Sequence, residues 1–263
     1  SGVLSGGFAL TKVGAGTLTL SGPNTYSGAT AVDAGTLELK GGNAITNAAP
    51  GVTVASTGRL LVTDAEVVSK VEGAGAMTLN AALTTGDTTA AVFSGAIDGT
   101  AGLVKQGTGS LTLSGAAANT YAGATLVNVG TLVAAKAGAL GTTAGGTTVA
   151  SGATLEINNV NIGTEGLSIA GLGAGGIGAL VGTGAGALAG GAVAMTADSR
   201  IGGAGTLGLS GVLSGGFALT KVGAGTLSLS GAAANTYTGA TLVNAGTLVA
   251  AKAGALGTTA GGT

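Results

Sequence analysis

The feature that most constrains this 263-residue chain is that it repeats itself at long range. Residues 1–22 return at 210–231 with a single change, and a diverged copy of them lies at 94–115. A longer segment, 114–147, recurs at 230–263 with two changes. Such internal identity is typical of an array of supersecondary units that stack on one another, and arrays of this kind have structural roles.

The repeats divide the chain into three modules of unequal length, which we expect to form a single continuous domain. The modules are approximately 1–93, 94–209 and 210–263. Because both ends of the sequence interrupt a repeat, we interpret the chain as a window of a longer array.

A finer period runs through every module, because Gly-Thr-Leu or a close variant recurs about every 20 residues, the length of one solenoid coil. Around it, apolar and small polar residues alternate, as in Leu18, Thr19 and Leu20. Alternation with a period of two predicts a strand with one buried face. Glycine-rich corners separate the strands, and a coil that wraps once per period pairs parallel strands without a helix. The sequence therefore predicts an all-β fold, a parallel β-solenoid.

Composition excludes several other classes of protein. With 45% apolar and 7% charged residues, the chain is not disordered, and its 56 glycines follow no triplet pattern that would indicate collagen. The absence of cysteine excludes disulfides and thiolate metal sites. A net charge of −1 without a basic cluster argues against nucleic-acid binding.

The stretch 169–195 carries no charge and is long enough to span a bilayer. Its many glycines disfavour a helix, and no aromatic or basic anchors flank it closely, so we predict no membrane insertion. The stretch also matches Gly-x-Gly-x-x-Gly at Gly171, Gly173 and Gly176, but no amphipathic helix follows, as a dinucleotide site requires. We expect coils of small residues here.

Catalytic chemistry has few candidate residues, since the chain has no histidine. The closest carboxylates, Asp64 and Glu66, would lie on the same face of a strand about 7 Å apart, near the spacing used by glycosidases. A second group would meet only across coils, as in polysaccharide-acting solenoids. It consists of Asp33, Glu38, Lys40 and Arg59. Both groups change in the later copies, so we expect a solvated outer face, no enzymatic activity, no cofactor and no metal.

The recurring motif reads Lys-x-Gly-x-Gly-Ser/Thr-Leu, then Leu-Ser-Gly, Asn-Thr-Tyr, Gly-Ala-Thr and Gly-Thr-Leu. In this form, at 10–37, 103–132 and 219–248, it resembles the autotransporter-associated β-strand repeat of bacterial passenger regions. The resemblance implies a right-handed parallel β-helix that a Gram-negative bacterium displays outside the cell.

Roles can be assigned to the motif residues. We expect the leucines to fill the core, the asparagines to cap backbone groups at a corner, and the tyrosines to pack at corners in preference to forming exposed adhesive rings. The motif residues are Lys12, Leu18, Leu20, Asn24, Tyr26 and Leu37 in the first copy, Lys105, Leu111, Leu113, Asn119, Tyr121 and Leu132 in the second, and Lys221, Leu227, Leu229, Asn235, Tyr237 and Leu248 in the third.

These observations favour an extracellular structural or adhesive solenoid that serves as a projecting stalk or scaffold. A segment of a self-assembling fibre, sheath or biofilm matrix is the alternative, and a polysaccharide-acting β-helix enzyme is a third hypothesis. The expected partners are further copies of the chain and a host or matrix surface.

Overall fold

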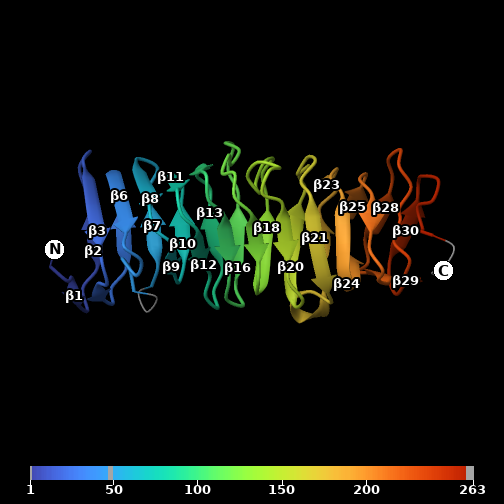
Figure 1. Cartoon of the computed structure of the whole chain (residues 1–263), viewed down its shortest axis with the longest axis horizontal. Coiled ribbons are helices and arrows are strands. Elements are labelled where there is room, and N and C mark those ends of the chain that lie inside the picture. Colours follow the sequence, from blue (N-terminus) through green and yellow to red (C-terminus); the bar gives the residue numbers. More distant parts are fainter. Residues whose placement is uncertain (1, 47–49, 259–263) are drawn as a thin grey trace.

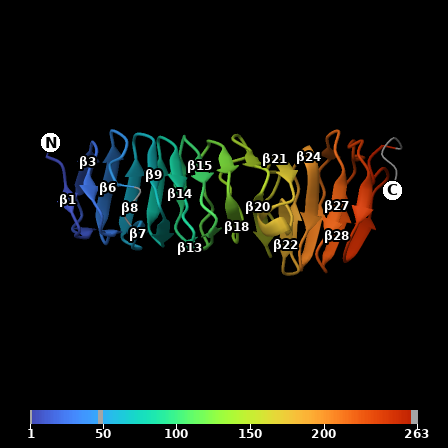
Figure 2. The same ribbon diagram turned by 90° about the horizontal axis from the view of Figure 1, so that it is seen from below.

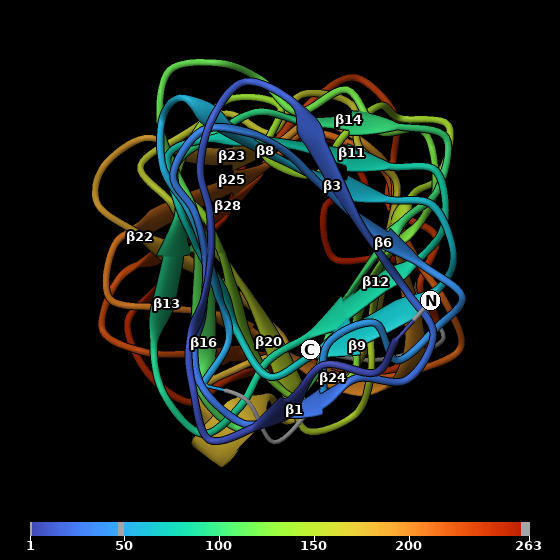
Figure 3. The same cartoon turned by 90° about the vertical axis from the view of Figure 1, so that its left-hand side faces the viewer.

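The computed structural model describes residues 2–46 and 50–258, so Ser1, Thr263 and the end of the second long repeat, 259–263, lie outside the described residues. The strands wind into about 12 coils, roughly 20 residues apart, that stack into a straight rod with the two ends of the chain at opposite ends (Figures 1 and 2). The fold is a β-solenoid, and every strand pairing in it is parallel. Viewed along the rod, the strands lie on three sides of a central axis (Figure 3).

The first face is a ladder that continues along nearly the whole rod. It consists of β2 (Leu10–Lys12), β5 (Thr30–Val32), β7 (Val52–Val54), β10 (Val71–Gly73), β13 (Ala91–Phe93), β16 (Ser110–Leu113), β18 (Gly130–Ala134), β20 (Ala153–Asn158), β22 (Leu180–Thr183), the second half of β24 (Val193–Gly202), β27 (Leu219–Val222) and β29 (Thr241–Val243).

The second face is built in the same way. It consists of β9 (Glu66–Val68), β12 (Leu83–Thr85), β15 (Leu103–Lys105), β17 (Thr125–Val127), β19 (Thr147–Val149), β21 (Leu167–Gly171), the first half of β24 and β26 (Leu213–Ser214). The pair β1 (Ser5–Gly6) and β4 (Thr25–Tyr26) occupies the same place in the order of the first coils.

The third face has two ladders, one in each half of the rod. The first consists of β3 (Thr17–Ser21), β6 (Gly35–Lys40), β8 (Gly58–Val62), β11 (Ala76–Leu79) and β14 (Ile97–Gly99), and the second of β23 (Ala187–Ala189), β25 (Thr206–Leu209), β28 (Thr226–Leu229) and β30 (Thr247–Ala250). Between them the chain continues the stacking without regular strands, through bonds such as Thr142 N–H to the Tyr121 carbonyl at 2.9 Å.

Alternating residues explain the slim core. On the third face Leu37 pairs with Leu60, Leu60 with Met77 and Met77 with Ile97, and all four are buried. Like residues stack on like in successive coils, so each coil adds apolar burial to the one before it. Gly130, the first residue of β18, turns the corner with a φ of 72°, and a methyl group there would overlap the Gly107 carbonyl oxygen. Only glycine permits both the conformation and the close stacking.

The three motif copies do not occupy equivalent faces. Lys12 and Lys221 both lie on the first face, in β2 and β27, whereas Lys105 lies on the second face, in β15. Every later element of the middle copy is shifted likewise, so that Asn119 bonds to the third face and Asn24 and Asn235 to the second. The unequal modules therefore leave the middle copy rotated by one face.

The glycine-rich stretch 169–195 departs in part from expectation. It supplies the end of β21, then β22, β23 and the start of β24, but residues 172–178 leave the coil as an outward loop that contains the short 3₁₀ turn η1 (Ala174–Gly176). Gly175 and Gly176 have positive φ angles, which the small-residue composition permits. Among the described residues, no helix is long and apolar enough to cross a membrane.

Candidate functional site

The motif asparagines join three consecutive coils. Asn119 Oδ1 accepts a hydrogen bond from the Ile97 N–H at 3.0 Å, one coil before, and its Nδ2 donates to the Ala139 carbonyl at 2.6 Å, one coil after. Asn24 and Asn235 form the same pair of bonds with their own neighbouring coils. The asparagines do not stack on one another. Each is a buried bridge that satisfies backbone groups on both sides.

The motif tyrosines are buried at the corner that follows. Each hydroxyl lies 2.6 to 2.7 Å from the hydroxyl of the threonine four residues on, in the pairs Tyr26 and Thr30, Tyr121 and Thr125, and Tyr237 and Thr241. Burial raises the pKa of all three phenols, so they stay protonated and can donate. These rings pack inside the rod and present no surface to a partner.

The motif lysines form the most distinctive arrangement. The Lys221 ammonium donates to three backbone carbonyls, those of Val222 at 2.8 Å, Gly223 at 2.8 Å and Ala245 at 3.0 Å. The first two belong to the end of β27 and the corner just after it, and the third belongs to the corner of the next coil. Lys12 and Lys105 make the same set of three bonds, with contact distances of 2.6 to 3.2 Å.

We call these three carbonyl acceptors around each lysine a cage. The ammonium group that they surround lies in the interior of the corner. All three lysines are buried, and an ammonium group has three N–H donors to match three acceptors. Burial lowers the pKa of Lys105 to about 8 and also lowers that of Lys221, so Lys105 still carries its proton at neutral pH. The group serves as a fixed cross-link between successive coils.

A second set of lysines extends the connection in the later copies. Lys136 Nζ donates to the Gly95 carbonyl at 2.7 Å, and Lys252 Nζ to the Gly211 carbonyl at 2.9 Å, both spanning 41 residues and hence two coils. Burial lowers the pKa of Lys136 to about 8. In these copies side-chain bonds alone thus hold three successive coils together.

The motif leucines lie where the alternation places them, with one difference at the ends of the rod. Leu18 and Leu248 are half-buried, whereas the remaining seven are buried. The buried ones are Leu20, Leu37, Leu111, Leu113, Leu132, Leu227 and Leu229. Leu18 and Leu248 lie in the first and last stacked strands of their ladders, where one side has no neighbour.

Asp64 and Glu66 do not form the carboxylate pair considered from the sequence, and the solvated outer face expected for both is wrong for Glu66. Asp64 lies in the corner before β9, is exposed, and accepts a bond from the Gly41 N–H at 2.8 Å. Glu66 points inward, is buried, and accepts from the N–H groups of Ala44 and Ile45 at 3.0 and 3.2 Å. Because the corner breaks the alternation between them, the two carboxylates face different environments and cannot share a substrate.

The second candidate group is also dispersed. Glu38 accepts from the hydroxyls of Thr19 and Thr63 at 2.7 and 2.9 Å, which lowers its pKa. Arg59 forms an ion pair with Asp98 at 3.1 Å, across two coils. Lys40 is exposed, and Asp33 is exposed at the corner before β6. Within residues 2–46 and 50–258, no cluster of three or more His, Cys, Asp or Glu side chains can hold a metal ion.

From the sequence, Lys12 and Glu165 receive no role and Glu66 is expected on a solvated outer face, although a signal for the interior is present. Lys12 has the same parity as Leu10 in β2, and Glu66 the same parity as Val68 in β9, so the alternation already places both inward. Glu165 is likewise buried and accepts from the Thr147 hydroxyl at 2.8 Å. A charged residue at an inward position in a chain with so few charges marks a structural polar site.

A family model described as the passenger-associated-transport-repeat matches residues 10–39, 103–134 and 219–250. The chain carries three passenger-associated-transport repeats. The matches coincide with the three copies that contain the lysine cages and the asparagine bridges. Such repeats in a β-solenoid support an autotransporter passenger-type β-helix, and the repeat family implies a secreted, surface-exposed protein. No curated protein and no solved structure matches the chain.

Proposed function

We propose that this chain is a structural segment of an autotransporter passenger of a Gram-negative bacterium, and that it projects other parts of the protein from the cell surface. Adhesion is then the output of the whole assembly, and the solenoid supplies length and rigidity. The motif contributes internal cross-links and no catalytic or cofactor chemistry. The carboxylates considered for an activity on polysaccharides, Asp64 and Glu66, face different environments.

The observation that carries this proposal is that the motif makes the same bonds on different faces. Lys105 and Asn119 repeat the contacts of Lys12 and Asn24 although the middle copy is rotated by one face. A recognition motif needs its copies to point toward a common partner. A cross-linking motif needs only its own corner and the adjacent coils, which is what a scaffold requires.

The repeats allow a direct test by lengthening the rod. Inserting a second copy of residues 23–231 after Gly231 creates native-like junctions and adds 209 residues, about 50 Å of rod at about 4.8 Å per coil. Inserting 116–231 at the same point also creates native-like junctions, adds about 30 Å, and rotates the following coils by one face. The first variant changes only the length of the rod, whereas the second changes both its length and the face on which the following strands lie.

We expect both variants to retain a β-type circular dichroism spectrum and to appear as longer rods by electron microscopy. When displayed on cells with an epitope at the outer end, both should move that epitope outward in proportion to the added length. Loss of folding in the rotated variant alone would contradict a face-independent motif. Unchanged epitope reach in both variants would contradict the stalk.

A second candidate function is assembly of copies end to end into an extracellular fibre or biofilm matrix. The arrangement of strands at the two ends of the rod favours it, because β29 and β30 of the last coil lie on the same faces as β2 and β3 of the first. Stacking a second copy would continue both ladders, and low net charge does not oppose contact. A polypeptide of these 263 residues should then form oligomers in sedimentation experiments, whereas a monodisperse monomer at high concentration would contradict assembly.

A further inference from the structure

The outward loop at residues 172–178 is held in place by side chains from two neighbouring coils. The Thr154 hydroxyl donates to the Gly178 carbonyl at 2.7 Å and accepts from the Ala174 N–H at 2.9 Å, and Thr154 is fully buried. Arg200 Nη1 donates to the Gly176 carbonyl at 3.1 Å. The loop is therefore anchored at three points against the first face of the rod. Loops fixed on a rigid scaffold are common sites of recognition.

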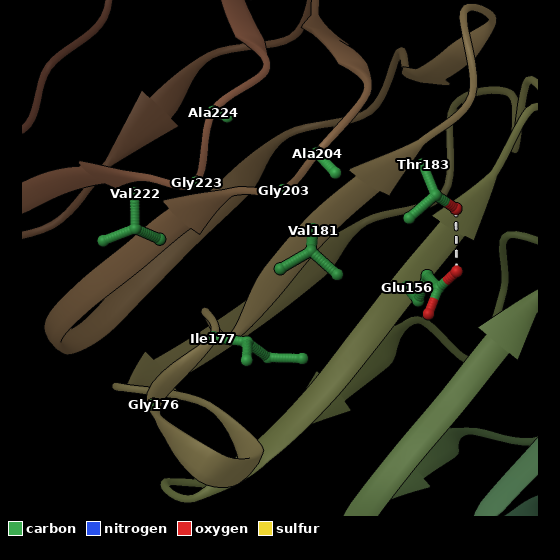
Figure 4. Close-up of a pocket in the computed structure, with 10 residues that line it drawn as sticks. All are labelled: Glu156, Gly176, Ile177, Val181, Thr183, Gly203, Ala204, Val222, Gly223 and Ala224. Atoms are coloured by element: carbon green, nitrogen blue, oxygen red, sulfur yellow. Dashed lines mark hydrogen bonds between the residues drawn. The ribbon is translucent and has the colours of Figure 1, made fainter. Parts of the chain in front are cut away.

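The loop borders a groove of about 380 Å³ that crosses the edges of successive coils (Figure 4). This volume is at the lower end of the range for ligand clefts. The groove is lined by Glu156, Gly176, Ile177, Val181, Thr183, Gly203, Ala204, Val222, Gly223 and Ala224. Gly176 and Ile177 belong to the outward loop, and the other lining residues come from the first face and from the corners that follow it, so the groove runs along the rod.

The groove has an apolar body and one acidic end. Ile177, Val181 and Val222 provide the apolar surface, and Ile177 is 52% exposed. Glu156 is the charged lining residue, and its Oε1 accepts from the Thr183 hydroxyl at 2.7 Å (Figure 4). Over the described part of the chain, Glu156 forms no ion pair. The guanidinium of Arg200 is bonded to the Gly176 carbonyl.

We propose that this groove binds a lysine side chain of an extended segment of a partner polypeptide. A lysine combines an aliphatic stem, which packs along Ile177 and Val181, with an ammonium head that complements the unpaired Glu156 carboxylate. Small apolar neighbours of that lysine would cover the Gly203 and Gly223 corners. The groove shares Val222 and Gly223 with the Lys221 cage, but the proposed binding does not depend on the scaffold function.

The affinity expected of a single such site is low, because a surface ion pair adds modestly to the binding of an apolar stem. A dissociation constant on the order of 1 mM suits a rod that meets its partner at a crowded surface. NMR titration of the isotopically labelled 263-residue chain measures affinities in this range.

The test compares three blocked peptides, Val-Ala-Lys-Ala-Val and its versions with norleucine or glutamate in place of lysine. We expect the lysine peptide to shift the amide signals of Ile177, Val181 and Val222, and the norleucine peptide to bind about fivefold more weakly. Glu156→Gln should reduce binding of the lysine peptide to the norleucine level, and Ile177→Ser should abolish it. Raising the salt concentration should weaken the lysine peptide only.

Val92→Ser serves as the matched control, because Val92 is an exposed outward residue of the same face, in β13, outside the groove. It should leave binding unchanged. Equal binding of the lysine and norleucine peptides, or shifts away from the groove, would overturn the proposal. Binding of butylammonium as tight as that of the lysine peptide would assign the groove to small amines instead. The unfolding midpoint of each variant separates loss of binding from loss of fold.

Discussion

Residues 2–22 and 211–231 have the same sequence except at one position, yet they lie in different environments. Leu4 is 41% exposed and its copy Leu213 is 1% exposed, and Phe8 and Phe217 are 83% and 37% exposed. In front of the second segment lies a coil that contains β24 and β25, whereas the structure has no coil in front of the first. Apolar burial in this rod is therefore a property of the neighbouring coil as well as of the sequence.

The polar bonds differ from the apolar contacts in this respect. Lys12 forms the same three carbonyl bonds as Lys221, at similar distances, although its coil has a neighbouring coil on one side only. The acceptors lie in the lysine's own corner and in the next coil. The three carbonyl bonds thus need only the coil that follows, and the motif forms them both at Lys12 and at Lys221.

The largest expected effect is at the motif glycine that precedes the third-face strand. A methyl group on Gly225 would overlap the Gly205 carbonyl oxygen, whereas one on Gly16 would have no atom within 4 Å. We expect Gly225→Ala to cost about 4 kcal/mol or more and Gly16→Ala less than about 1 kcal/mol. Unfolding by urea measures both, and similar losses would contradict the role of the preceding coil.

The next effect concerns the core leucines. Leu227 is buried between β25 and β30, whereas its copy Leu18 is half-buried and pairs only with Leu37. Leu227→Ala should cost about 3 kcal/mol because it leaves a cavity, and Leu18→Ala about 1 kcal/mol. Ser228→Ala, which alters an outward position of the same strand, is the control and should be nearly neutral. Equal losses for the two leucines would break the comparison.

The lysine cages sharpen the comparison, because here the two segments should behave alike. Lys221→Met and Lys12→Met both leave three carbonyls without their donor, and we expect each to cost about 2 kcal/mol. Lys40→Met removes an exposed lysine and should have little effect. If Lys12→Met proves harmless, the cage also depends on the preceding coil.

The smallest effect is a dependence on pH from a buried acid in the middle of the rod. Burial raises the pKa of Glu165 above 4.5, so the stability linked to its protonation is present below pH 4.5 and is lost as the pH rises through the raised pKa. Glu165→Gln keeps an acceptor for Thr147 and removes this loss, so its stability relative to the native chain should be higher at pH 7 than at pH 4.

Glu66→Gln provides the contrasting variant. Burial raises the pKa of Glu66 as well, but both of its carboxylate oxygens accept backbone N–H groups, and an amide can accept only one of them. The third motif copy has no counterpart of these two buried acids, because its described residues after Tyr237, 238–258, contain no acid. Glu66 and Glu165 are thus the described carboxylates whose pKa is raised. A pH series on a variant that carries Glu165→Gln and Glu66→Gln should therefore lose most of its slope between pH 4 and 7. If the dependence of stability on pH persists in this variant, it originates from exposed carboxylates instead.

Much of the fold follows from the sequence, because the alternation and the repeats act locally. The period near Leu18 and Leu20 predicts a strand, and the fixed turn around Asn119 predicts a corner cap, as the structure has it. The number of faces and the rotation of the middle copy depend on how many residues each corner consumes. The rotation is already present at Lys105 in β15, so it arises in the coils between the first and middle copies, and only the closed coil determines it.

The groove and its loop are not predictable from the sequence for a different reason. Residues 169–195 contain mainly glycine and alanine, whose small side chains give no alternation to separate strand from loop. The loop exists because Thr154 and Arg200, from other coils, supply its anchors. Contacts of this kind between distant residues become visible only when the coils are stacked. The inward direction of Lys12, by contrast, is readable from its parity with Leu10.

The rotation of the middle motif has a consequence for the gene that encodes such a rod. Recombination between near-identical stretches of DNA inserts or removes segments whose lengths are set by where the copies align, with no regard to whole turns of the product. A cross-link that closes its own corner on any side of the rod accepts the result, as the steps of 93 and 116 residues between successive motif lysines illustrate. We therefore expect unequal crossing-over to be able to change the reach of the array without preventing its folding.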